Sequence, residues 1–172
     1  MKAASIIGLG FLLLIAQSTF AAVVPFDLVV PNAALAVVIY MGLHGYNAGY
    51  GAVVSFALGY LMDTFAGSPL GLYTFVAVAV FLLSRIAALR LFLKGWLFEI
   101  ALTLFWAAVA GVLVLLVRGL FDQDFRSLLT NLKIVTCRAA ATAVVAPLVF
   151  RAMAWLEGMT AKRKAEGRAF RD

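Results

Sequence analysis

Long apolar stretches alternate with short polar segments along nearly the whole chain. Four of six such stretches are long enough to cross about 30 Å of hydrocarbon as helices, which takes about 20 residues. The second and third are shorter, roughly 21 and 24 Å at 1.5 Å per residue. The pattern predicts an all-α polytopic membrane protein with six transmembrane helices. The stretches cover residues 5–24, 31–44, 47–62, 70–93, 96–117 and 134–155.

The segment between the two short stretches decides whether they form one helix or two. It reads HGYNAGYG over residues 44–51, and its three glycines and one asparagine favour a break between two helices. Short, glycine-interrupted spans often mark the functional interior of a membrane protein, although they also occur where the bilayer is locally thin. If residues 31–62 instead form one bent crossing, the chain has five spans and its N-terminus lies outside.

Composition supports a membrane protein. Of the 172 residues, 65% are hydrophobic and 13% are charged, whereas soluble domains average about 45–50% apolar and about 25% charged residues. A soluble fold of this size could not bury so much apolar surface. We therefore expect a single transmembrane domain over residues 1–156, followed by a basic cytoplasmic tail over 157–172.

The charges indicate an orientation. With the N-terminus in the cytoplasm, the cytoplasmic segments hold ten of the 14 Lys and Arg residues, which satisfies the positive-inside rule. The outer connections hold four aspartates, Asp27, Asp63, Asp122 and Asp124. The five-span alternative leaves every later loop on the same side and is opposed by Lys2 alone. Both topologies place the C-terminus in the cytoplasm.

The first apolar stretch has two interpretations. Its basic start, apolar centre and small-residue end are typical of a secretory signal peptide. The residues that follow, however, lead directly into the next apolar stretch. We expect the segment to be retained as a membrane anchor.

One polar stretch, GYLMDTFAGSPLGLY over residues 59–73, lies between two apolar segments. On the six-span topology it connects the third and fourth spans on the outer side, where Gly67 and Pro69 suit a tight turn. A carboxylate such as Asp63 is costly beside lipid unless it is solvated or paired. We therefore expect water, a capping role in its own turn, or an ion pair with Arg138 of the last span.

Small residues recur every four positions just before this stretch, at Gly51, Ser55 and Gly59. Residues at this spacing share one face of a helix. In a membrane, a stripe of small residues allows a neighbouring helix to approach closely. The stripe therefore predicts a helix-packing face on the third span.

The segment 119–133, GLFDQDFRSLLTNLK, is amphipathic. Its helical pattern predicts a helix that lies on the outer membrane surface, with the charged residues on the other side. This helix either connects two spans or, together with the Asp63 turn, forms a surface for a protein partner. The predicted apolar face consists of Phe121, Phe125, Leu128, Leu129 and Leu132.

No pattern of catalytic groups is present. The chain has no HExxH or GxSxG motif and no pair of carboxylates within a span. Asp122 and Asp124 are two residues apart and would be poorly aligned for a shared metal on a helix. His44 and Cys137 are the only residues of their types, so no metal site is expected from them. We predict that the protein is not an enzyme and needs no cofactor.

Residues 31–73 resemble the core of the bacterial rod shape-determining protein MreD family. That core begins with a proline and a short apolar helix, continues through a glycine-containing turn, and includes a helix that ends in a glycine and, four residues later, an aspartate. A G-x-P-L-G turn closes it. Many members carry basic residues in the first turn, where this chain has His44 and Asn47. The matching motif residues are Gly59, Asp63, Gly67, Pro69, Leu70 and Gly71.

The resemblance implies a non-catalytic scaffold of the cell-elongation machinery in the bacterial inner membrane, where it would help to organise peptidoglycan synthesis. The implied partners are MreC, the MreB filament, the RodA glycosyltransferase and a class B penicillin-binding protein, with membrane lipid around the chain and no nucleic acid. The family's fold also resembles the membrane substrate-binding subunits of energy-coupling-factor transporters. The alternative function is therefore a small-molecule, vitamin-type binding subunit, although such a site needs several convergent polar groups and the predicted spans offer few.

Overall fold

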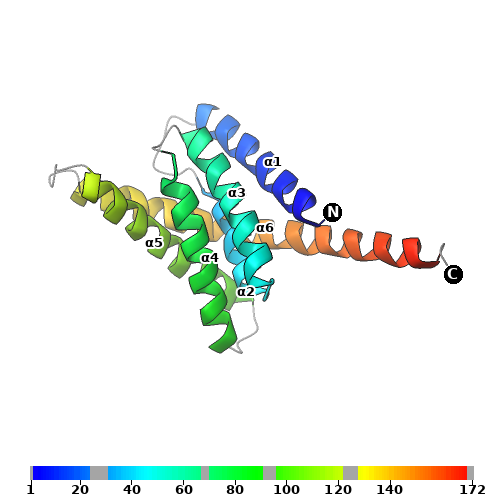
Figure 1. The fold of residues 1–172 in the computed structure, drawn as a ribbon. Helices are drawn as coiled ribbons and strands as arrows, with labels where there is room; N and C mark the ends of the chain where they lie inside the picture. The colour runs from blue at the N-terminus through cyan, green and yellow to red at the C-terminus, as the bar shows by residue number, and fades with distance from the viewer. Residues whose placement is uncertain (1, 24–30, 67–69, 91–95, 122–127, 170–172) are drawn as a thin grey trace.

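Six helices make up the part of the chain that the computed structural model describes, residues 2–23, 31–66, 70–90, 96–121 and 128–169. Within these ranges there is no strand, so the predicted all-α class is confirmed. Each predicted apolar stretch lies on one helix, and α2 and α3 are separate helices (Figure 1). The helices are α1 (Lys2–Val23), α2 (Ala33–Leu43), α3 (Ala48–Ala66), α4 (Leu72–Arg90), α5 (Trp96–Phe121) and α6 (Leu128–Ala169).

Two of these helices are long and apolar enough to cross a membrane. By length and composition the crossing segments are Glu99–Val117 in α5 and Ile134–Met159 in α6. Three further segments are apolar but shorter, and they lie in α1, α2 and α4. The helical content is therefore compatible with a membrane protein, while the number of crossings stays a prediction.

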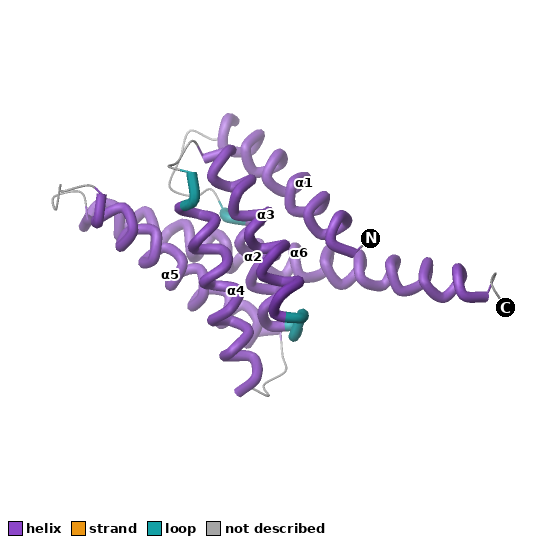
Figure 2. Tube along the Cα trace, in the orientation of Figure 1, coloured by secondary structure: helices purple, strands orange, loops and turns teal. Residues whose placement is uncertain are grey.

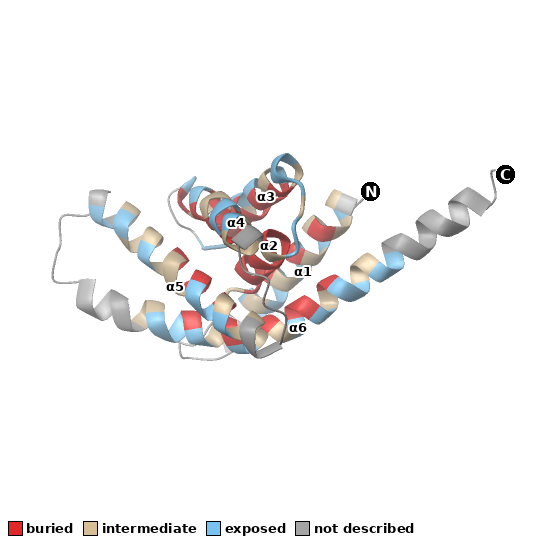
Figure 3. Cartoon of the chain, turned by 90° about the horizontal axis from the view of Figure 1, so that it is seen from below, coloured by how far each residue is buried: buried red, intermediate tan, exposed pale blue. Residues whose placement is uncertain are grey.

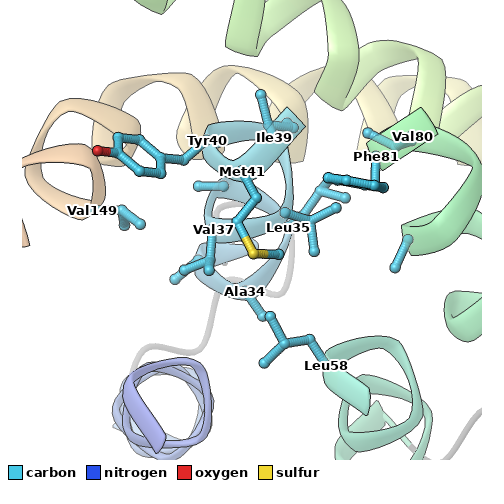
Figure 4. Packing of buried hydrophobic residues seen from close by; sticks show 14 of the residues in the cluster. Ala34, Leu35, Val37, Ile39, Tyr40, Met41, Leu58, Val80, Phe81 and Val149 are labelled. Atoms are coloured by element: carbon cyan, nitrogen blue, oxygen red, sulfur yellow. The ribbon is translucent and has the colours of Figure 1, made fainter. Parts of the chain in front are cut away.

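Helix α2 lies at the centre of the bundle. Every residue from Ala33 to Gly42 is buried, and α2 packs against each of the other five helices. Figure 4 shows its side chains pointing in several directions, with Leu58, Phe81 and Val149 from three other helices around them. A helix that is apolar on all sides is expected in such a position, and the buried residues in Figure 3 gather around it.

Both ends of α2 have well-defined caps. At its start, the Asn32 side chain accepts a hydrogen bond from the Leu35 N–H at 3.1 Å, as N-cap residues do. At its end, Gly45 has a φ of 70°, and the Tyr46 N–H donates to the Met41 carbonyl at 3.3 Å. This six-to-one bond around a left-handed glycine is a Schellman motif, so the glycine-containing turn in the sequence does end the helix.

Helices α3 and α4 form a closely packed antiparallel pair. An added Cβ at Gly59 would lie 2.5 Å from the Thr74 Cα, so only glycine fits between these two backbones. An added Cβ at Gly51 would overlap the Phe81 ring. Gly51, Ser55 and Gly59 are all buried, and they share the face of α3 that meets α4.

Helices α5 and α6 form the second extensive pair, and the end of α5 and the start of α6 lie away from α1 and α3 (Figure 1). An added Cβ at Gly111 would overlap the Val135 side chain, so a small residue again permits the contact. α6 has 42 residues, roughly 63 Å at 1.5 Å per residue. Its last turns extend past the other helices, as the tube in Figure 2 shows, so the segment 157–169 of the predicted tail continues the helix.

Gly59→Ala is expected to destabilise the protein by about 1–3 kcal/mol, because the new methyl group meets backbone atoms that cannot move aside. Gly8→Ala is the matched control, since nothing lies within 4 Å of its added Cβ. There the better helix propensity of alanine should leave stability unchanged or raise it by up to about 1 kcal/mol. Thermal unfolding of the two purified variants in detergent measures this. Equal midpoints would show that α3 and α4 are not in backbone contact.

Candidate functional site

The Asp63 carboxylate lies at the junction of α3 and α4 and is 1% exposed. Its two oxygens accept four hydrogen bonds from the start of α4. The backbone N–H groups of Gly71, Tyr73 and Thr74 donate at 3.0, 2.8 and 3.1 Å. The Thr74 hydroxyl donates a fourth bond at 2.6 Å. The buried charge is therefore surrounded by donors.

Asp63 of α3 therefore acts as the N-cap acceptor for α4, although it belongs to a different helix. Gly71 occupies the cap position, because its carbonyl accepts the first bond of the helix from the Phe75 N–H at 2.9 Å. Glycine has no side chain to accept the N–H groups of the next residues, and its φ of 103° is one that other residues rarely adopt. Asp63 supplies the missing acceptor and places a negative charge at the positive end of α4. The spacing between aspartate and glycine in the motif is thus explained by one interaction.

Burial and hydrogen bonding have opposite effects on the acidity of Asp63, which follows the apolar stretch 47–62. Burial raises the pKa of the carboxyl group, but the bonds from Thr74, Tyr73 and Gly71 outweigh it and hold the pKa below its ordinary value. Hydrogen bonds to the charged form have this effect in general. The group is therefore a carboxylate at neutral pH.

The other residues of the predicted motif are distributed around this junction. Gly59 lies one turn before Asp63 on the same face, against Thr74. Leu70 is 73% exposed beside the capped helix start. Gly67 and Pro69 lie outside the described residues. The structure thus brings Gly59, Asp63 and Gly71 together.

The structure describes Arg138 and part of the predicted amphipathic segment. Arg138 is exposed on α6 and lines a cavity that Met62 and Tyr73, the neighbours of the Asp63 junction, also line. The ion pair between Asp63 and Arg138 stays a prediction. Of the predicted amphipathic face, Phe121 ends α5, Phe125 lies outside the described residues, and Leu128, Leu129 and Leu132 belong to α6. Its contact with a membrane surface stays a prediction as well.

A second polar cluster lies at the opposite end of α3 and was not anticipated. The Tyr46 and Tyr40 hydroxyls both donate to the Glu157 carboxylate, the latter at 3.3 Å. The His44 ring stacks on Tyr40 with 3.8 Å between ring centroids. Burial, and then the bond to Glu157, raise the pKa of Tyr46, which lies in the turn between α2 and α3. The cluster ties this turn to α6, and its one sequence signal is an acidic residue beside a strongly basic tail.

Neither polar cluster has the composition of a metal centre. Among the residues that the structure describes, no three His, Cys, Asp or Glu side chains lie together. The Asp63 junction has one carboxylate whose lone pairs are directed at backbone donors, and the Glu157 cluster has one carboxylate with two phenols. Both arrangements are suited to holding helices in place.

Comparison with known proteins gives one match. The family model described as rod shape-determining protein MreD matches residues 2–155, which includes both polar clusters except Glu157. No curated protein and no solved structure matches the chain.

Asp63→Asn is expected to lower the free energy of unfolding by about 1–3 kcal/mol, because the amide loses the charge and one of the two acceptor oxygens. Thermal unfolding in detergent measures the loss. Glu99→Gln is the control, since it neutralises a partly exposed carboxylate on α5. The folded pKa of Asp63 lies below its ordinary value of 3.8, so its contribution is fully present above about pH 4 and is lost as the pH falls further. If the difference in unfolding free energy between the wild type and Asp63→Asn vanished between about pH 5 and 8, that would contradict this cap.

Proposed function

The chain belongs to the MreD family of rod shape-determining proteins, and we propose that it acts as a non-catalytic scaffold in the cell-elongation complex of the bacterial inner membrane. The family consists of membrane proteins of the rod-shape complex, is defined by shape determination, and is not known as a family of enzymes. A role within a complex implies protein partners. The observation that carries the proposal is the match over residues 2–155, nearly the whole chain.

We propose that the chain crosses the membrane six times with both termini in the cytoplasm. The positive-inside distribution of Lys and Arg supports this orientation. The turn between α2 and α3 and the Glu157 cluster then lie at the cytoplasmic end, and the Asp63 junction lies at the outer end. The five-span arrangement places the N-terminus outside and leaves every loop after residue 62 on the same side.

The outer end is the proposed contact site for MreC. Asp63 fixes the start of α4, and the neighbouring Leu70 is 73% exposed. An exposed apolar side chain on a preorganised backbone costs little entropy to bury against a partner. The amphipathic segment 119–133 would complete this surface.

The cytoplasmic end is the proposed contact site for the remaining machinery. α6 continues to Ala169, and its last turns carry Lys162, Arg163, Lys164 and Arg168. Each basic residue near an anionic leaflet is worth about 1 kcal/mol. Through this end and its spans the protein would reach the MreB filament, RodA and a class B penicillin-binding protein, and so help to organise peptidoglycan synthesis.

The second candidate function is a small-molecule binding subunit of a transporter. One observation favours it, a cavity of about 440 Å³ near the outer end of the bundle, a size within the range of about 300–1,000 Å³ for small-molecule sites. A vitamin-type ligand needs several convergent polar groups. Three of the polar side chains in this cavity already accept hydrogen bonds from backbone N–H groups of the protein. Their oxygens are therefore not available to a ligand, which favours the scaffold function.

Co-purification from detergent tests the scaffold. The tagged full-length chain is expected to capture MreC saturably. The Leu70→Ala variant is expected to bind MreC at least about fivefold more weakly, because it loses one apolar side chain that the partner would bury. Ile86→Ala is the matched control, because Ile86 is 56% exposed near the far end of α4, the helix whose start lies beside Leu70. Absence of MreC capture by the wild-type chain, together with saturable vitamin binding, would reverse the order of the two functions.

A further inference from the structure

The cavity of about 440 Å³ is bounded by all six helices near the Asp63 junction. Its walls are mostly aliphatic and small side chains, among them Val76, Ala110 and Val135. Ala110 is 4% exposed, so this wall lies deep in the bundle. The polar lining residues are few: Gln17, Ser18, Asn32, Tyr73, Arg138 and Thr142.

Three of these polar side chains hold the start of α2. The Gln17 carbonyl oxygen accepts the Ala33 N–H at 3.1 Å, and Asn32 caps its own helix. The Thr142 hydroxyl accepts the Asn32 N–H at 2.9 Å and donates to the Arg138 carbonyl at 2.7 Å. The oxygen atoms of these three side chains are thus already bonded within the protein, and most of the other lining side chains are aliphatic or small.

Arg138 gives the cavity a charged rim. It is exposed and lines the cavity, and its guanidinium carries five N–H donors in a planar fork. An arginine beside apolar surface is costly unless it pairs with an anion. The guanidinium can bind two phosphate oxygens at once. On the six-span topology Arg138 lies about one turn below the outer membrane surface, close to the phosphate layer of the bilayer.

We propose that this cavity holds an acyl chain of an anionic phospholipid whose phosphate lies against Arg138. The aliphatic walls match the chain, the rim matches the headgroup, and the surrounding bilayer supplies both in one molecule. The lipid would fill the space between the α5–α6 pair and the ends of α1, α3 and α4, which together line the cavity. It would thereby join the second extensive helix pair to the rest of the bundle at the outer end. This lipid site goes beyond the scaffold role and does not require a particular protein partner.

Native mass spectrometry of the full-length protein tests the site. The detergent-solubilised chain is supplied with equal amounts of phosphatidylglycerol and phosphatidylcholine that carry the same acyl chains. The wild-type protein is expected to retain one phosphatidylglycerol in preference to phosphatidylcholine. Arg138→Gln should reduce this preference about tenfold, the effect of one charge-assisted hydrogen bond. Arg151→Gln, at an exposed arginine farther along the same helix, should leave it unchanged.

A second variant and a competitor locate the acyl chain. Ala110→Leu narrows the cavity and should lower retention of both lipids, with thermal unfolding to show that the variant is folded. Free glycerol phosphate should not displace the lipid, because it lacks the chain that fills the cavity. Equal retention by the wild type and Ala110→Leu would place the lipid on the outside of the helices and overturn the proposal. So would an unchanged headgroup preference in Arg138→Gln, or displacement by free glycerol phosphate.

Discussion

Backbone N–H groups at the start of a helix have no partner within that helix, and inside an apolar bundle water cannot supply one. At α2 and α4, side chains from neighbouring helices provide the acceptors. Asp63 of α3 accepts the first N–H groups of α4. At α2, acceptors come from Asn32, from Gln17 of α1 and from Thr142 of α6. The caps thus connect helices that are distant in the sequence, and they fix where each short helix begins.

Close packing follows once the helix starts are fixed. Between apolar helices in lipid there is little hydrophobic driving force, so association depends on close contact and on polar bonds. Gly59 permits backbone contact with Thr74 directly below the Asp63 cap. Gly111 permits the approach of Val135 in the α5–α6 pair. At the other end of α3, the Glu157 carboxylate accepts a hydrogen bond from the Tyr46 hydroxyl and holds the turn between α2 and α3 to α6. The result is a bundle in which hydrogen bonds to a carboxylate hold the helices together at each end of α3.

The sequence predicted the helices well because apolar stretches of this length have few alternatives in a membrane. It also predicted the break between α2 and α3 within residues 44–51, and it drew attention to Asp63, since a carboxylate between apolar segments needs an explanation. The partners of Asp63 could not be derived, because water, an arginine and a helix start all satisfy a carboxylate. The bond between Tyr46 and Glu157 joins residues 111 positions apart, and no spacing rule connects them. The length of α6 was missed because its basic end is equally compatible with an extended tail.

Residue-resolved amide hydrogen exchange of the detergent-solubilised protein tests the cap on α4. Without a cap, the first N–H groups of a helix exchange quickly, because they have no partner. We expect the amides of Tyr73 and Thr74 to exchange as slowly as those in the interior of α3, and at least about tenfold faster in Asp63→Asn, a loss of one charge-assisted bond. Exchange in the wild-type protein as fast as in an uncapped helix start would contradict the cap.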